Sequence, residues 1–276
     1  MKLAVIGRYY DLITPLGSGG QPFEIYYLKK DGYSGDTATG IPMAKYMVWQ
    51  ISFMLISLYI LIFQPHFASN TLVLILCWIG LGLTLTLFLF VLFMSITKKM
   101  GASFIVGILK LLHKIKIVKD YRKALFKVLK FVKQYQDCIK SFVKSPLTIV
   151  LTTIATILST IGNAIIAYFI YISFVDVPIV TPFEIVCKCC LTELAVCFFP
   201  MPGGSGATEL SFSALIGSLF PEGTLFWCVL LWRILTYYIY IIHGLIYILY
   251  DFFKNKKHHN KASISKFNKE KESIEN

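Results

Sequence analysis

The sequence predicts an all-α, polytopic helical membrane protein, on the strength of its composition and its long apolar stretches. Of 276 residues, 56% are hydrophobic and only 15% are charged, whereas soluble domains have about 25% charged residues. A helix needs about 20 apolar residues to cross a bilayer, and four stretches approach or exceed this length: 46–63, 71–96, 147–175 and 224–250. Because they are apolar all round rather than along one stripe, they are predicted to be membrane spans.

The positive charge lies beside these spans. Residues 97–146 contain thirteen Lys or Arg and two acidic residues, and residues 251–276 contain seven Lys and four acidic residues. Basic segments next to spans mark the cytoplasmic side, so both segments are placed in the cytoplasm. The net charge of +12 therefore comes mainly from basic segments that flank membrane spans, and no nucleic-acid partner is expected.

This orientation leaves 183–220 with both ends outside. The span 147–175 leaves the cytoplasm and the span 224–250 returns to the basic tail, while 28–45 is expected to be a cytoplasmic loop. The stretch between the last two spans is too short for two more spans and a turn. Its apolar arms, 183–199 and 208–220, predict a re-entrant hairpin with "PMPGGSG" at the tip.

The tip has the residues of a buried helix break. Pro200 and Pro202 stop the preceding arm, and the glycines allow positive φ and close backbone approach. The N-terminus of the following helix suits an anion such as a phosphate headgroup. A simple helix break filled by neighbouring side chains is the alternative.

A second stretch, "TPLGSGGQPFE" at 14–24, resembles "MPGGSGATE" at 201–209. When Pro15 is aligned with Pro202, Gly-Ser-Gly matches Gly-Ser-Gly. A carboxylate follows in each stretch, Glu24 and Glu209, and the two are offset by two positions in this alignment. Three spans separate the two stretches, so the first enters from the cytoplasm and the second from outside. Two glycine-broken segments of opposite orientation are typical of an inverted repeat with a substrate site at the midplane.

Three regions carry a family resemblance: "GRYYDLITPLGSGGQPFEIYYLKK", "FFPMPGGSGATELSF" and "LWRILTYYIYIIHGLIYIL". Together they resemble the lysylphosphatidylglycerol synthase/flippase transmembrane family, with 1–250 as a flippase-like transmembrane domain and 251–276 as a polar basic tail. The resemblance implies a bacterial or archaeal cell-membrane protein. Its best-known members attach lysine to phosphatidylglycerol and flip the product, which gives resistance to cationic antimicrobial peptides.

The chain departs from the full family pattern in two ways. The spans that usually precede the "GRYY" region and the soluble aminoacyl-transferase domain are both expected to be absent. We therefore expect no phosphatidylglycerol lysyltransferase activity from this chain alone. No catalytic constellation, cofactor or metal site is expected either, because the histidines are dispersed and "CKCC" at 187–190 has no second Cys/His cluster.

Charged residues inside membrane segments normally face the bundle interior or a cavity. Arg233 is predicted to pair with Glu209 or Glu193, or to meet a lipid phosphate. Lipid-headgroup binding is predicted for the two motifs and the charged or aromatic residues near them: Arg8, Tyr10, Pro15, Gly17, Ser18, Gly19, Gly20, Gln21, Glu24, Glu193, Pro202, Gly203, Gly204, Ser205, Gly206, Glu209 and Arg233.

The basic loop contains a helical pattern of its own. From Tyr121 to Phe142, apolar residues recur in steps of three and four with lysines off the stripe. A basic amphipathic helix of this kind is expected to lie on the anionic inner leaflet or to dock under the bundle. A short coiled coil is the remaining alternative.

Two functions are consistent with the sequence. The first is a lipid flippase or lipid-binding transporter whose partners are membrane phospholipids, either anionic or lysyl-modified. The second is a membrane subunit of a separate synthase or envelope-lipid enzyme, without transport of its own.

Overall fold

The computed structural model describes residues 2–68, 71–96 and 144–254, together with scattered residues between 106 and 140. Every regular element in this described part is a helix, so the predicted all-α class is confirmed. Four helices are long and apolar enough to cross a membrane: Gly35–Phe63, Thr71–Leu89, Pro146–Phe174 and Leu225–Lys254. The predicted amphipathic helix at 121–142 falls largely outside the described residues.

The first long helix begins earlier than the sequence predicted. Helix α3 spans Gly35–Phe63, whereas the prediction placed 28–45 in a loop. Ser34 caps this helix by accepting the Thr37 N–H at 3.3 Å, and Pro42 lies within it. Lys45 therefore lies on a long helix instead of in a cytoplasmic loop.

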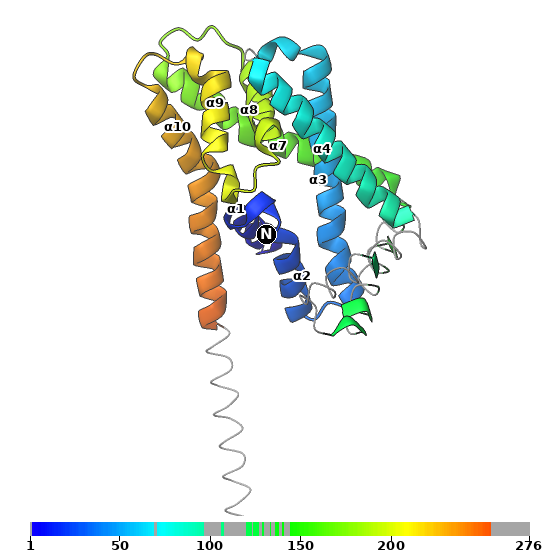
Figure 1. Cartoon of the computed structure of the whole chain (residues 1–276). Coiled ribbons are helices and arrows are strands. Elements are labelled where there is room, and N and C mark those ends of the chain that lie inside the picture. Colours follow the sequence, from blue (N-terminus) through cyan, green and yellow to red (C-terminus); the bar gives the residue numbers. More distant parts are fainter. Residues whose placement is uncertain are drawn as a thin grey trace, which may run out of the picture.

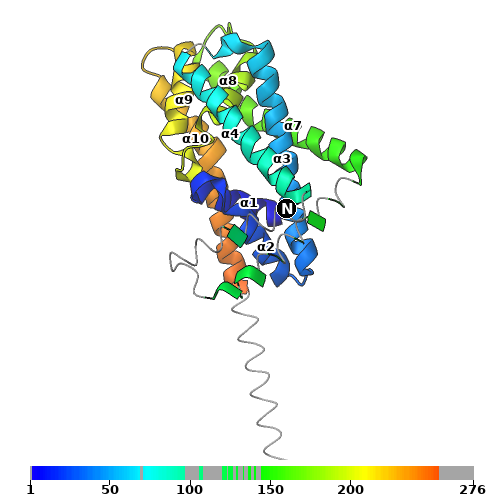
Figure 2. The same ribbon diagram turned by 45° about the vertical axis from the view of Figure 1, so that its right-hand side comes forward.

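Two helical hairpins, each broken by a glycine-rich turn, pack among the long helices. In the first, α1 (Lys2–Ile13) leads through the turn Pro15–Gly17 to α2 (Gly20–Lys30). In the second, α8 (Pro182–Val196) leads through the turn Pro202–Gly204 to α9 (Ala207–Ile216). The yellow tip of the second hairpin reaches the blue first hairpin near the middle of the molecule (Figure 1 and Figure 2), and the two turns are in contact.

Helix α8 lies at the centre of the apolar core. It packs against α4 (Thr71–Ile96), α7 (Pro146–Phe174) and α9, and its buried residues include Ile185, Leu191 and Leu194. A Cβ added to Gly80 of α4 would meet the backbone carbonyl of Leu194, so these two helices cross at close range. The second turn itself is more open than this core: Pro202, Ser205 and Gly206 are exposed, and Gly203 and Gly204 are half-buried.

The last long helix contains an irregular turn. Helix α10 (Leu225–Arg233) runs directly into a π-helix at Ile234–Tyr238, and the helix then continues to Lys254. Single π-turns inside helices are frequent at functional sites, and this one follows Arg233 immediately.

Candidate functional site

The two glycine-rich turns begin with the same backbone conformation and diverge at their serines, where Ser18 has φ −90°, ψ −7° and Ser205 has φ −53°, ψ 136°. Thr14 (φ −106°, ψ 148°) corresponds to Met201 (φ −109°, ψ 141°). Leu16 (φ 56°, ψ 17°) corresponds to Gly203 (φ 59°, ψ 16°), both in the left-handed region. The alignment made on the two prolines therefore matches residues of equivalent conformation as far as Gly17 (φ 59°) and Gly204 (φ 64°).

Each turn is closed by its serine. The Ser18 hydroxyl donates to the Pro15 carbonyl at 2.9 Å, and the Ser205 hydroxyl donates to the Pro202 carbonyl at 3.0 Å. Each serine N–H also donates to the same carbonyl. The serines therefore stabilise the turns, and this local role differs from a direct headgroup contact.

A carboxylate caps the start of the helix after each turn. Asp11 of α1 accepts the Gly20 N–H at 2.8 Å, and Glu209 of α9 accepts the Gly206 N–H at 2.6 Å. Part of the anion site expected at the N-terminus of α9 is thus occupied by the protein's own Glu209 carboxylate.

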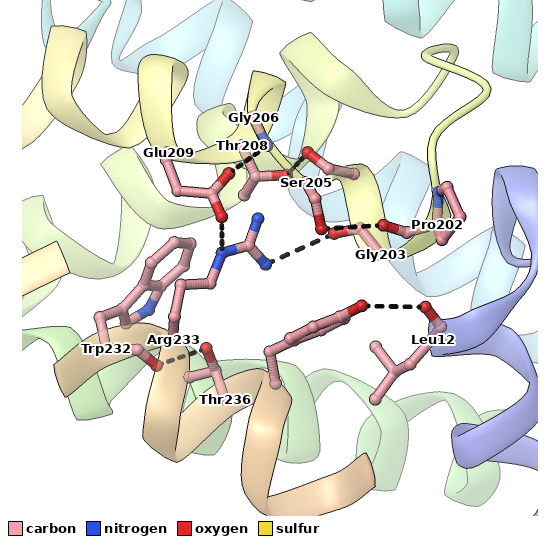
Figure 3. A network of polar contacts seen from close by, with 12 residues as sticks. Leu12, Pro202, Gly203, Ser205, Gly206, Thr208, Glu209, Trp232, Arg233 and Thr236 are labelled. Carbon is pink, nitrogen blue, oxygen red and sulfur yellow. Dashed lines mark hydrogen bonds and ion pairs between the residues drawn. The ribbon is translucent and has the colours of Figure 1, made fainter. Parts of the chain in front are cut away.

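Arg233 is buried between the second turn and α10 (Figure 3), with 7% of its surface exposed. Its Nε lies 2.7 Å from Oε1 of Glu209, so the predicted ion pair between these residues is present. Its Nη1 donates to the Gly203 carbonyl over a long 3.4 Å contact, and its Nη2 has no hydrogen-bond partner among the described residues. A buried guanidinium with an unused donor can accept a further anion.

Aromatic rings enclose the same guanidinium. The Arg233 Cζ lies 5.3 Å from the ring centroids of both Trp232 and Tyr237, within the range of cation–π attraction. The Tyr237 hydroxyl also donates to the Leu12 carbonyl of the first hairpin at 3.3 Å, as Figure 3 shows. A Cβ at Gly203 would overlap the Tyr237 ring, so this position of the turn must be glycine.

Glu193 is not the ion-pair partner of Arg233. Its side chain is exposed, whereas Arg233 pairs with Glu209. Arg8 lies on α1, exposed, with its guanidinium 5.4 Å from the Tyr240 ring of the last long helix. Arg8, of the first motif region, therefore lies beside the same long helix that carries Arg233.

The remaining predicted residues lie around the first turn. Tyr10 stacks on Phe23 across the hairpin with ring centroids 3.5 Å apart. Gln21 is half-buried in the first turn of α2. Glu24 is buried and forms a salt bridge with Lys45 of α3.

Sequence reasoning overlooked Lys45, Asp11 and Tyr237. Lys45 stands directly before the apolar stretch 46–63, and Asp11 stands four residues before the proline of the first motif. Isolated charges at those places were a usable signal, because charges inside membrane segments are rare and usually functional.

The fold and the site define a helical membrane protein in which two glycine-broken hairpins meet beside a buried arginine. The family model described as "Lysylphosphatidylglycerol synthase TM region" matches residues 1–244. The chain belongs to this family, as its three motif regions had indicated. No match is found among curated proteins or among solved structures.

Proposed function

We propose that the chain binds a polar phospholipid such as lysylphosphatidylglycerol at the paired turns and carries its headgroup across the cell membrane. The observation that carries this proposal is the contact between two turns whose first residues share one backbone conformation, beside a buried arginine with a free donor. Glycine-broken segments that meet in this way form the midplane substrate sites of many transporters.

The chemistry of the site fits a phosphodiester. A phosphate oxygen can accept a hydrogen bond from Nη2 of Arg233 without breaking the ion pair between Nε and Glu209. Such a bond is charge-assisted and strong in surroundings of low dielectric constant. Family membership supports lysylphosphatidylglycerol as the lipid and, through masking of envelope charge, a contribution to resistance against cationic antimicrobial peptides.

The experiment is translocation of labelled lysylphosphatidylglycerol in vesicles that contain the purified chain. We expect lipid movement between leaflets, and a loss of about tenfold or more in Glu209→Gln, which leaves the Arg233 charge unpaired. Gly204→Leu should also fail, because any Cβ at this position would overlap the Thr208 hydroxyl. A lysine substitution in the polar tail, Lys256→Gln, serves as the control and should not change the rate.

If no lipid moves in any preparation, the transport proposal is wrong. The chain would then be a membrane subunit that works with a separate synthase, and co-purification with such an enzyme would be the next measurement.

A further inference from the structure

We propose that Lys45 and Glu24 form a second site for a phosphate-bearing lipid headgroup, in the opposite half of the membrane from Arg233 and Glu209. This inference rests on the proposed function, and it adds a cation that the motifs did not indicate. It starts from the salt bridge between Lys45 of α3 and Glu24 of α2.

The two ion pairs occupy corresponding places in the two hairpin units. Glu24 lies on the helix after the first turn, and Glu209 lies on the helix after the second turn. Each pairs with a cation on the next long helix: Lys45 is about 15 Å from the start of α3 at Gly35, and Arg233 is about 12 Å from the start of α10 at Leu225. The repeat therefore includes a long helix and its cation as well as the hairpin.

In the second unit, one carboxylate both caps a helix and pairs with a cation. In the first unit, two different carboxylates have these two roles. Glu209 both caps Gly206 and pairs with Arg233. In the first unit, Asp11 provides the cap at Gly20, while Glu24 pairs with the cation. This division explains why Glu24 and Glu209 are two positions out of step in the sequence alignment.

Lys45 has the capacity to bind a phosphate. Its ammonium group carries three donors, and the salt bridge to the buried Glu24 uses one of them. With 54% of its side chain exposed, Lys45 is reachable, whereas Glu24 fits in place because Gly7 leaves it room. Lysine binds phosphate as a point charge, and Lys45 stands directly before the apolar stretch 46–63 of α3, where basic residues favour anionic headgroups.

Arg8 links the first hairpin to the helix that carries Arg233. It lies on α1, and its guanidinium is 5.4 Å from the ring of Tyr240 on the last long helix. An exposed cation of the first hairpin therefore lies beside that helix.

The test uses phosphatidylglycerol with a photoreactive diazirine in its headgroup, reconstituted with the full chain in phosphatidylcholine vesicles. Adducts are mapped by mass spectrometry after illumination. We expect two clusters of adducts, one on the α2–α3 peptides near Lys45 and one on the α9–α10 peptides near Arg233.

Variants assign the first cluster to the cation. Lys45→Met keeps the apolar stem, and it should lower the α2–α3 adducts about tenfold or more, the loss expected for one charge-assisted hydrogen bond. The α9–α10 adducts should remain. Lys45→Arg should retain both clusters, and Lys29→Ala, which removes an exposed lysine at the end of α2, is the matched control.

The outcomes separate this inference from the proposed function. Translocation without adducts near Lys45, or α2–α3 adducts that persist in Lys45→Met, would overturn the second site and leave the proposed function standing. Both clusters without translocation would support the second site and reject transport. Adducts that disappear in excess inorganic phosphate would assign the site to free phosphate and overturn the lipid assignment.

Discussion

The ion pair between Arg233 and Glu209 holds the second turn to the last long helix, and its exchange gives a quantitative prediction. The perturbation is a cycle of three variants: Arg233→Glu, Glu209→Arg and the double variant. Removing one partner of a buried pair destabilises a protein by about 3–5 kcal/mol. Because the Glu209 side chain is 31% exposed, we expect each single variant to lose near the lower end of this range, about 3 kcal/mol.

The double variant should recover part of this loss. Residues in direct contact show coupling energies of about 0.5–3 kcal/mol. Because the side chain at position 233 is only 8% exposed, we expect the restored pair to have a coupling energy of about 1.5 kcal/mol or more. Arginine at 209 cannot accept the Gly206 N–H that Glu209 accepts. This lost cap is common to both variants with arginine at 209, so its cost cancels from the coupling energy.

The assay is unfolding in a titration with sodium dodecyl sulfate, followed by tryptophan fluorescence. Trp232 is a suitable reporter because it is adjacent to Arg233 and stacks on Phe212 of α9 with ring centroids 4.3 Å apart. If the losses of the two single variants simply add in the double variant, the pair contributes no coupling and the reasoning about this contact is refuted.

Two matched pairs of glycine substitutions test the close approaches by the same unfolding titration. Gly203→Ala should lose about 1–3 kcal/mol more than Gly17→Ala. Both glycines have φ near +59°, but a Cβ would meet the Tyr237 ring at Gly203, whereas at Gly17 the nearest atom is 3.8 Å away. Equal losses would show that the ring contact does not matter. Gly80→Ala should destabilise by about 1–3 kcal/mol because its Cβ would meet the backbone of Leu194. Gly82→Ala, with open space around it, should be neutral or gain up to about 1 kcal/mol, and a similar loss at both positions would contradict the close crossing of α4 and α8.

The long helices and the second hairpin were predictable because their signals are local. Uninterrupted apolar sequence defines the spans, and the proline and glycine cluster at 200–206 marks the break between α8 and α9. The proline-based alignment of the two motifs also succeeded, since turn chemistry is determined by a few adjacent residues. Whether the hairpins are re-entrant and form an inverted repeat stays a prediction.

The start of α3 and the pairing of Lys45 were not predictable in the same way. The sequence predicted a loop over 28–45, yet the Ser34 cap and packing against α2 start the helix at Gly35 and carry it through Pro42. Tertiary packing here overrides local propensity. The salt bridge between Glu24 and Lys45 joins residues on two different helices, and no single stretch of sequence contains that information.

Leu16 makes the two turns unequal in energy, although their backbones match at this position. Among the described residues it is the one non-glycine with positive φ, and this conformation costs an L-residue roughly 1–2 kcal/mol. Gly203, its counterpart, pays no such steric penalty. In any exchange between two arrangements of the turns, a state that relaxes Leu16 would be favoured about tenfold over one that relaxes Gly203. The two turns are thus not interchangeable in energy, and one leucine is enough to make the difference.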